Sequence, residues 1–347
     1  MKILVIAPSW IGDLVMSQTL LIKLKEMYPD CIIDVLCPQW CIQVINRMPQ
    51  VNKSLLMPIG HGSFDLKGRY NLGKQLRSEN YETCYILPNS WKSALIPLFA
   101  KIKNRIGWIG ESRYLLLTSY RKNKKDFPKL IERYTSLALD KTITKGNDIG
   151  TITYPCLEAS KELTDEIIEK YKLNKNHKSL GICPGAEFGK TKQWAPEYYA
   201  KYIELFLEKY PKGEIRIFGS NKDVEISNTI KSLVCDSKQS QIKILAGKTS
   251  LLDAIDIIAN TNLVICNDSG LMHITAAVKT KLVAIFGSTS TLYTPPSTTN
   301  DMCLLIESDE PCHPCFKKTC KFNSLACLKK ISPDYVWEQT LGKWNDV

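Results

Sequence analysis

The sequence predicts an α/β protein with two doubly wound domains, each a parallel sheet covered by helices on both faces. Short β-branched runs alternate with longer periodic segments, as in KILVIA followed by 14–28 and CIIDVLC followed by 41–47. The same alternation starts again at SLGICPG, near residue 179. A polar passage rich in Thr and Lys, over 141–154, separates the two series.

The predicted elements follow one another in βα order. In the first series we expect strands near 2–7, 31–37 and 83–88, with helices over 14–28, 41–47 and 91–101. A helical stretch after 134 and a charged amphipathic helix over 158–172 come next. In the second series we expect strands near 179–183, 214–218, 242–246, 263–267 and 281–286, with helices over 196–210, 224–234 and 251–259 and one from 271.

A chain of 347 residues with 44% hydrophobic content is long enough for about two domains. We place the first domain at 1–172, the second at 173–332, and a last helix at 333–347. Packing of that helix against the first domain is one arrangement to test. Loops at the carboxyl ends of the strands are where open α/β sheets bind ligands, so the junctions there are the candidate sites.

Composition limits the partners and the compartment. The formal charge of +11 favours an acidic partner such as a nucleotide, a phosphorylated sugar or an anionic lipid surface. Nucleic acid is not expected, because the basic residues are scattered and no nucleic-acid-binding motif is found. No apolar run approaches the roughly 18 residues of a spanning helix, and ILVIA is interpreted as a strand rather than a signal peptide. Thirteen cysteines without a secretory signal predict a cytoplasmic protein.

The first junction, PSWIGDLVMSQ, carries Gly12 and Asp13. Gly12 would give a tight turn after the strand, and Asp13 would stand at the start of the following helix. Asp13 is therefore a candidate for catalysis, with a helix N-cap as the alternative. A GxGxxG dinucleotide fingerprint is absent.

The second junction, GICPGAEFGKTKQW, has three glycines and two lysines before the helix at Pro196. Such a loop can present N–H groups and an ammonium to a diphosphate. Lys192 would neutralise the charge that grows on a leaving nucleotide. The alternative is a solvated lysine in a surface loop.

The third and fourth junctions carry short polar side chains. LVICNDSGLMH ends a buried strand at Asp268, Ser269 and Gly270, where free N–H groups of a helix would face an anion. Asp268 could instead be a cap, and His273 one turn later could be a packed histidine. KLVAIFGSTS places Gly287, Ser288 and Thr289 for phosphate or ribose contacts, and Asp223 after EIRIFGSNK could accept from ribose hydroxyls.

Six blocks of the sequence occur in order along the chain: APSWIGDLVMSQ, CPGAEFGKTKQW, FGSNKD, NDSGLMHITAA, FGSTSTLYTPP and CHPCFKKTC. Together they resemble the ADP-heptose:lipopolysaccharide heptosyltransferases of glycosyltransferase family 9, and within that family the heptosyltransferase II type. NRIGWIGESRYLLL resembles the acceptor-domain stretch of the family. One departure is KTKQWAP, where Gln193 replaces a more usual arginine while Lys192 keeps its place.

The resemblance implies a GT-B fold with an acceptor-binding first domain and an ADP-heptose-binding second domain, no cofactor and no metal for transfer. Asp13 would be the base that deprotonates the first core heptose. The donor would be bound by Gly185, Glu187, Lys192, Asp223, Asp268, Ser269, Gly270, His273, Gly287, Ser288 and Thr289. The phosphorylated Kdo-lipid A acceptor would meet Gly12, Lys92, Arg105 and Arg113. We expect a monomer in peripheral contact with the inner membrane.

Four cysteines, Cys312, Cys315, Cys320 and Cys327, lie within sixteen residues and could hold zinc or an iron–sulfur cluster. Their spacing departs from paired CxxC knuckles, and free thiols in a folded loop are the alternative. Two further functions stay open: heptosyltransferase I or III, with another acceptor, and a metal-containing module that binds anionic ligands without catalysis.

Overall fold

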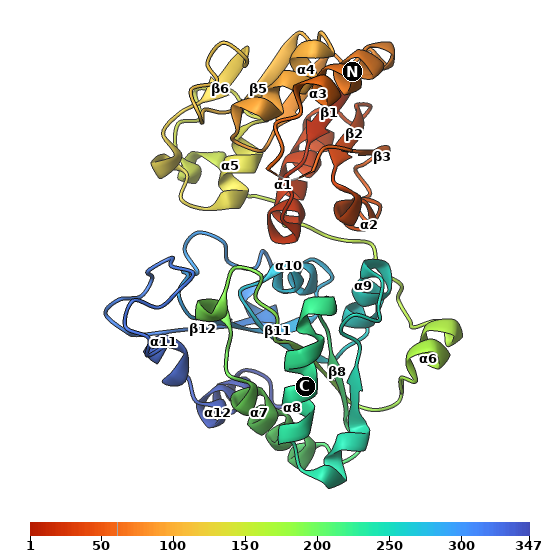
Figure 1. Cartoon of the computed structure of the whole chain (residues 1–347), viewed down its shortest axis with the longest axis vertical. Coiled ribbons are helices and arrows are strands. Elements are labelled where there is room, and N and C mark those ends of the chain that lie inside the picture. Colours follow the sequence, from red (N-terminus) through yellow and green to blue (C-terminus); the bar gives the residue numbers. More distant parts are fainter. Residues whose placement is uncertain (61) are drawn as a thin grey trace. The chain divides into compact units, whose positions relative to one another are not determined.

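The structure, a computed structural model, describes residues 1–60 and 62–347. The chain divides into two compact units, Met1–Glu158 (unit 1) and Ala159–Val347 (unit 2), and each contains one six-stranded sheet (Figure 1). The neighbouring strands in both sheets pair in parallel. This confirms the predicted α/β class. Within the described ranges, none of the helices has the length and apolar character needed to cross a bilayer.

Unit 1 begins with a buried strand, β1, and its longest helix, α1, follows directly. Its strands are β1 Lys2–Ile6, β2 Ile32–Cys37, β3 Lys53–Leu56, β4 Thr83–Ile86, β5 Asn104–Trp108 and β6 Ser119–Arg121. Its α-helices are α1 Ile11–Met27, α2 Ile42–Ile45, α3 Leu66–Leu76, α4 Leu95–Phe99 and α5 Leu130–Ser136. Its 3-10 turns are η1 Gln39–Cys41, η2 Arg77–Glu79, η3 Trp91–Ala94, η4 Lys124–Asp126 and η5 Gly146–Ile149.

The strand order of unit 1 is β3-β2-β1-β4-β5-β6, so the chain reverses direction across the sheet between β1 and β4. This is the doubly wound order, in which loops beside the reversal point gather at the carboxyl edge. Register pairs Val5 with Val35 on one side and with Tyr85 on the other. The central strands are buried on both faces, which explains their nearly continuous apolar sequence.

Unit 2 repeats the pattern. Its strands are β7 Ser179–Cys183, β8 Glu214–Ile217, β9 Ile242–Ile244, β10 Leu263–Asn267, β11 Lys281–Phe286 and β12 Cys303–Glu307. Its α-helices are α6 Asp165–Tyr171, α7 Pro196–Lys209, α8 Val224–Leu233, α9 Leu251–Ala259, α10 Gly270–Ala277, α11 Ala326–Lys329 and α12 Pro333–Lys343. Its 3-10 turns are η6 Lys190–Lys192, η7 Asn221–Asp223, η8 Asp236–Gln241 and η9 Asn300–Met302.

The strand order of unit 2 is β12-β11-β10-β7-β8-β9, the same winding as in unit 1. Its core contains an aromatic group around the fully buried Trp194, with Tyr199 and Tyr202 edge-on to its ring at centroid distances of 5.0 and 6.4 Å. The indole N–H of Trp194 donates to the Ile331 carbonyl at 2.9 Å. This ties the start of α7 to the segment before α12.

The division between the units lies after Glu158, fourteen residues earlier than the boundary we expected at 172. Helix α6 contacts unit 2, because Lys170 and Tyr171 both bind the Asp253 carboxylate of α9. The helix expected over 158–172 is also shorter than expected. It begins only at Asp165, where the Thr164 hydroxyl caps the Ile167 N–H.

The last helix, α12, packs on α7 of unit 2, where Thr340 and Tyr202 join their hydroxyls at 2.9 Å. The chain terminus reaches the same region, since the Tyr210 hydroxyl accepts from the Val347 N–H. Residues 333–347 therefore belong to unit 2.

The strands that the sequence pattern missed are mostly edge strands. β3, β6 and β12 lie at sheet edges and have partly exposed, mixed patterns. An edge strand needs no long apolar run, because only one neighbour pairs with it and solvent reaches its other side. The helical stretch expected after 134 is likewise displaced, since α5 already ends at Ser136.

Candidate active site

Asp13 lies in the first turn of α1, two residues after the helix begins at Ile11. The N-cap position is occupied by Trp10 in extended conformation, without a side-chain capping bond. The alternative of Asp13 as an N-cap is therefore wrong in position. Asp13 is the acidic residue of the first turn, where the helix dipole favours negative side chains. Gly12 is itself a helical residue, so the turn after β1 is made by the residues before it.

Helix α1, which carries Asp13, is anchored to the rest of unit 1 by hydrogen bonds of its buried side chains. The buried Gln18 amide donates to the Cys156 carbonyl at 2.8 Å and accepts from the Cys156 N–H at 3.0 Å. The Thr19 hydroxyl reaches the Ile131 carbonyl of α5 at 3.4 Å. These bonds fix the position of α1, and therefore of the Asp13 backbone in its first turn.

In unit 2 the structure brings together Lys192, Asp268 and Thr289 from three different junctions. The Lys192 ammonium donates to Asp268 Oδ2 at 2.6 Å, and the Thr289 hydroxyl donates to the same oxygen at 2.7 Å. The side chains of Lys192 and Asp268 are only 14% and 5% exposed. The alternatives of a solvated lysine and of a helix-capping Asp268 are both wrong: the lysine is held by a carboxylate, and the carboxylate serves no helix end.

Asn267, the last residue of β10, connects this group to the rest of the loop. Its side-chain oxygen accepts from the Trp194 N–H and the Tyr199 hydroxyl, each at 3.0 Å. Its amide donates to the Pro184 carbonyl at 2.8 Å. Pro184 comes before Lys192 in the chain, and Trp194 and Tyr199 come after it. Asn267 is not among the predicted site residues, although an Asn at the end of the apolar strand LVICN is a usable signal, because a buried amide needs partners.

Helix α10 begins at Gly270, directly after this group, and has eight residues. Its N-cap Ser269 is extended and makes no side-chain capping bond. The first N–H groups of a helix have no intrahelical partner and carry partial positive charge. The start of α10 is thus suited to an anionic group beside Lys192, as the sequence predicted.

His273 lies one turn into α10 and is buried, and its Nδ1 has no hydrogen-bond partner among the described residues. Burial lowers the pKa of His273 to about 4; Asp268 opposes this shift and Lys192 adds to it. The ring is therefore neutral at pH 7 in the chain without ligand.

Three other predicted donor residues bind one another or their neighbours. Asp223 accepts from the Ser220 N–H and hydroxyl, each at 2.8 Å, at the start of η7. Gly185 lies against it, because a Cβ there would be 2.6 Å from Asp223 Oδ1. Glu187 forms an exposed ion pair with Lys222. These contacts join the β7 and β8 loops next to the Lys192 segment.

Gly287 and Ser288 pack the β11 loop onto the β7 loop. A Cβ at Gly287 would be 2.6 Å from the Thr191 carbonyl, so only glycine allows this approach. The Ser288 N–H donates to that carbonyl at 3.1 Å, and its buried hydroxyl meets the Thr191 hydroxyl at 3.1 Å. Ser288 therefore supports the loop, and Thr289 is the member of this junction that reaches Asp268.

The predicted acceptor residues differ in their surroundings. Arg113 is 1% exposed, and its guanidinium donates to the Pro88, Ser90 and Trp108 carbonyls. We therefore correct its assignment, because a group so enclosed holds loops together and does not reach an acceptor. Arg105 donates to the Leu116 and Ile102 carbonyls at 2.8 and 2.7 Å, so it too serves the fold.

Lys92 is half-buried and its ammonium donates to the Gly62 carbonyl at 2.6 Å. Its ammonium makes this bond at an exposed loop and not in the core of unit 1. It therefore remains a candidate for an acceptor phosphate.

The four clustered cysteines lie in the segment between β12 and α12, and all thirteen cysteines are free thiols in the structure. Burial raises the pKa of Cys327, and the nearby Cys312, Cys315 and Cys320 add to that rise. Among the residues that the structure describes, no set of three or more His, Cys, Asp or Glu side chains could hold a metal ion. The segment packs on the candidate site, since the Thr191 hydroxyl donates to the Lys317 carbonyl at 2.6 Å.

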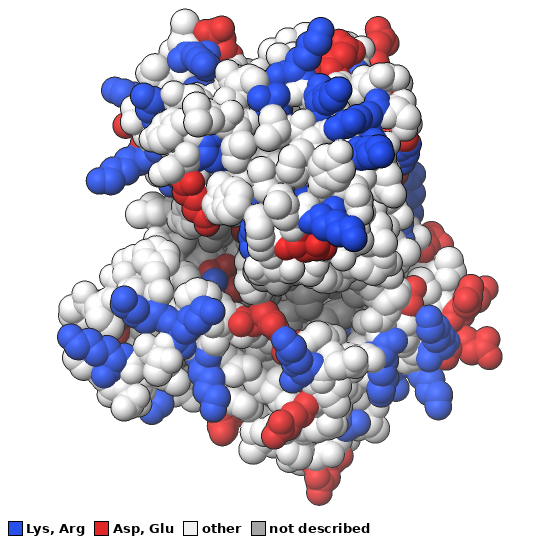
Figure 2. Space-filling model, turned by 45° about the horizontal axis from the view of Figure 1, so that its top comes forward, with Lys and Arg blue, Asp and Glu red and all other residues white. Residues whose placement is uncertain are grey.

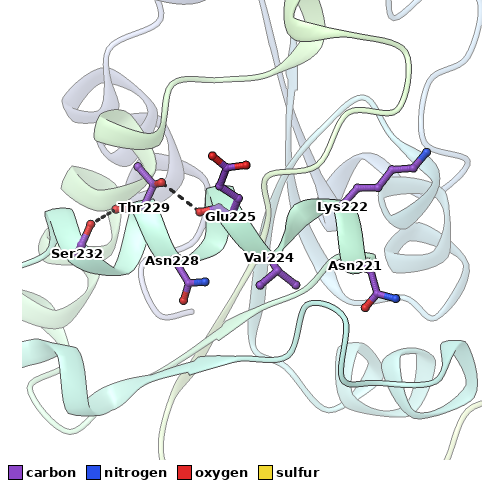
Figure 3. Close-up of a pocket in the computed structure, with 7 residues that line it drawn as sticks. All are labelled: Asn221, Lys222, Val224, Glu225, Asn228, Thr229 and Ser232. Carbon is purple, nitrogen blue, oxygen red and sulfur yellow. Dashed lines mark hydrogen bonds between the residues drawn. The ribbon is translucent and has the colours of Figure 1, made fainter.

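A separate open hollow runs along η7 and α8 of unit 2 (Figure 3). Seven residues line it: Asn221, Lys222, Val224, Glu225, Asn228, Thr229 and Ser232. The hydroxyls of Thr229 and Ser232 donate to helix carbonyls at 3.1 and 2.9 Å, so they are already used within the helix. Two predicted site residues adjoin it: Asp223 lies in η7 between the lining residues Lys222 and Val224, and Glu187 forms an ion pair with Lys222.

The chain is similar to known proteins along most of its length. The model of the family described as glycosyltransferase family 9 (heptosyltransferase) matches residues 69–326. Lipooligosaccharide heptosyltransferase 2 of Haemophilus influenzae is 46% identical over 301 residues, covering 85% of this chain and 86% of that protein. Lipopolysaccharide heptosyltransferase 2 of Escherichia coli is 43% identical over 300 residues, covering 85% of each. The solved structure of E. coli ADP-heptose lps heptosyltransferase II matches with a TM-score of 0.86 and 37% identity, over 99% of this chain and 98% of that one.

Proposed function

The chain belongs to glycosyltransferase family 9, the heptosyltransferases, and on that premise we propose that it moves L-glycero-D-manno-heptose from ADP-heptose to the first heptose of the lipopolysaccharide inner core, with inversion. The observation that carries the proposal is the group of Lys192, Asp268 and Thr289 beside the open start of α10. A cation and helix N–H groups at one sheet edge are what a nucleotide diphosphate requires.

On the donor side, the bond from the anomeric carbon to the diphosphate oxygen breaks, and negative charge grows on the ADP that leaves. Lys192 and the N–H groups at Ser269 and Gly270 stabilise that charge. Because Asp268 holds the Lys192 ammonium at 2.6 Å, the lysine is already oriented before the donor arrives. Asp268 and Thr289 are then placed for the sugar or the ribose hydroxyls.

On the acceptor side, Asp13 is the general base. It takes the proton of the acceptor hydroxyl while that oxygen attacks the anomeric carbon in line, which forms the new glycosidic bond and inverts the centre. The reaction consumes ADP-heptose and the acceptor and gives ADP, the lengthened saccharide and a proton. In this mechanism neither a metal ion nor a cofactor takes part.

The acceptor is a phosphorylated Kdo-lipid A carrying one heptose, bound through unit 1. We infer a cytoplasmic monomer that works at the inner membrane surface. The relatives at 43–46% identity carry the name heptosyltransferase 2, which supports the mono-heptosylated acceptor over those of heptosyltransferases I and III.

The test compares transfer from ADP-heptose to acceptors with Kdo alone and with Kdo plus one heptose, for the native chain and Asp13→Asn. We expect transfer to the mono-heptosylated acceptor only, and a loss of about a thousandfold in the variant. Asp30→Asn is the matched control, since Asp30 is an exposed carboxylate of the same unit, outside the helix.

Transfer to the acceptor without heptose would change the assigned type, and no transfer to either would contradict the proposed reaction. Full activity of Asp13→Asn would remove Asp13 from the mechanism. ADP should still protect Asp13→Asn against heating, because the donor residues lie in unit 2.

A further inference from the structure

The segment between β12 and α11, residues 308–325, packs on two of the loops that form the polar group of unit 2. On the loop after β7, the Thr191 hydroxyl donates to the Lys317 carbonyl at 2.6 Å. On the loop after β11, the Ser288 carbonyl accepts from the Phe316 N–H at 2.8 Å. These two bonds fix the backbone of the segment beside the loop that carries Lys192.

A glycine in the loop after β7 makes this approach closer still. Gly189 has a φ of +142°, a conformation that side chains other than glycine rarely adopt. A Cβ at this position would be 2.9 Å from the Lys318 carbonyl oxygen. The backbone of Lys318 therefore touches the loop at a point where only glycine fits.

The side chain of Lys318 shares an aromatic ring with Lys192. The Lys192 ammonium lies 5.0 Å from the centre of the half-buried Phe188 ring, and the Lys318 ammonium lies 5.7 Å from the same centre. Both distances are within the range in which an aromatic ring attracts a cation. Phe188 thus keeps the two ammonium groups near each other, although they are 126 positions apart in the chain.

The charges of the polar group do not by themselves suit a diphosphate. The Lys192 ammonium is paired with the Asp268 carboxylate at 2.6 Å, so the two charges offset each other. Lys222, in the neighbouring loop after β8, is paired with Glu187 in the same way. A diphosphate carries more than one negative charge and is bound most strongly by charged donors. A further cation is therefore needed beside Lys192.

Lys318 has the charge that this balance requires. It is exposed, and within the described ranges its ammonium has no carboxylate partner. It also belongs to a basic stretch, because residues 316–330 contain five lysines and no acidic residue. In Figure 2, Lys and Arg side chains gather on the left of unit 2, the side on which Figure 1 shows α11.

We propose that Lys318 is a second cation of the donor site, which binds the diphosphate of the nucleotide sugar together with Lys192. The inference rests on the proposed function, which supplies the nucleotide diphosphate. Because Asp268 offsets the charge of Lys192, the net positive charge that attracts the donor comes from Lys318. Lys318 is then a donor-binding residue that lies outside the strand junctions.

The same segment contains a matched control. Lys321 lies 5.8 Å from the centre of the Phe322 ring, so its charge and its distance from a ring resemble those of Lys318. The Phe322 ring, however, is 64% exposed, whereas Phe188 is half-buried beside Lys192. A lysine that merely covers an aromatic ring at the surface should behave as Lys321 does.

The experiment is isothermal titration calorimetry of the full chain with ADP and with adenosine at low salt. Lys318→Gln should raise the Kd for ADP about fivefold, the value of an exposed ion pair. It should leave the Kd for adenosine unchanged, because adenosine has no phosphate. Lys318→Arg should keep most of the affinity, Lys321→Gln should bind as the native chain does, and high salt should reduce the difference between Lys318→Gln and the native chain.

Three results would overturn the proposal. Lys318→Gln could bind ADP as tightly as the native chain, or Lys321→Gln could lose as much affinity, which would make the effect one of general charge. A fall in adenosine affinity equal to that for ADP would show that the substitution disturbs the loop and that Lys318 does not bind phosphate.

Transfer assays separate this proposal from the proposed function. With ADP-heptose and the mono-heptosylated acceptor, Lys318→Gln should raise KM for the donor about fivefold and leave kcat unchanged. If the native chain transfers no heptose to any acceptor yet binds ADP through Lys318, the proposed function fails and the role of Lys318 stands. If transfer occurs and ADP binding does not depend on Lys318, only the role of Lys318 fails.

Discussion

The two units share one sheet topology, yet the charged side chains near their carboxyl edges are used differently. In unit 2 this edge has a largely buried cluster of polar side chains, in which Lys192 and Thr289 both donate to one oxygen of Asp268. In unit 1 the same edge shows exposed apolar side chains on loops, and the charges beneath them, Arg69 and Arg113, are buried and bound to carbonyls.

This difference teaches how one scaffold can place charge in two ways. In unit 2 the edge brings a cation and a carboxylate together beside the start of a helix, as a small, highly charged ligand would require. In unit 1 the buried guanidinium groups instead bind backbone carbonyls and hold loops together.

Lys192→Ala should give the largest change on the donor side. We expect kcat to fall about a hundredfold to a thousandfold, because one preorganised charge that stabilises the leaving group is lost. Steady-state kinetics with ADP-heptose measures it, with Lys190→Ala as the control, since Lys190 is an exposed lysine in the same turn. Equal effects of the two substitutions would mean that the loop's overall charge matters and not the Asp268-bound position.

Arg113→Met should mainly destabilise unit 1. We expect the free energy of unfolding in urea to drop by about 3 kcal/mol, because several buried carbonyls lose their donor. Arg77→Met is the control: Arg77 makes one bond, to the Phe99 carbonyl at 2.8 Å, and should cost about 1 kcal/mol. Native stability with lost acceptor binding would return Arg113 to the role first predicted from the sequence.

The buried His273 should make unit 2 sensitive to acid. Its pKa in the folded chain, about 4, lies below its ordinary 6.5, so the unfolded chain binds more protons between these values. Its contribution to stability is therefore complete above about pH 6.5 and is lost as the pH falls towards 4. Urea unfolding across this range should show about 2–3 kcal/mol less decline for His273→Asn than for the native chain. Parallel curves for the two proteins would contradict this.

Asn267→Asp should disturb the loop after β7, which carries Lys192. A carboxylate keeps the two bonds that Asn267 accepts but repels the Pro184 carbonyl to which the amide donates. We expect KM for ADP-heptose to rise about tenfold, with a smaller change in kcat. Asn262→Asp is the control at the other end of β10, because the Asn262 side-chain oxygen accepts from the Ser179 N–H and hydroxyl and a carboxylate would keep both bonds. A loss of kcat at constant KM would place Asn267 in the chemistry instead of in loop positioning.

Much of the fold was predictable because strands buried in a parallel sheet have a recognisable sequence, a nearly continuous run of apolar residues. The predicted strands at β1, β2, β4, β7, β8, β10 and β11 are nearly all buried, so their residues are apolar on both faces. Edge strands such as β3 and β12 lack that signature, and α6 starts late because Thr164 caps it.

For the candidate site, the sequence determined the junctions and the residue types: Asp13 after β1, Lys192 after β7, Asp268 after β10 and Thr289 after β11. Order along the chain suffices for this, because each junction follows its own strand. Which side chains meet was decided only by the tertiary structure, since contact between residues 76 or 97 positions apart depends on how strands are ordered in the sheet. That ordering joined Lys192 to Asp268, gave Asn267 its partners, and buried Arg113 among carbonyls that no local pattern could indicate.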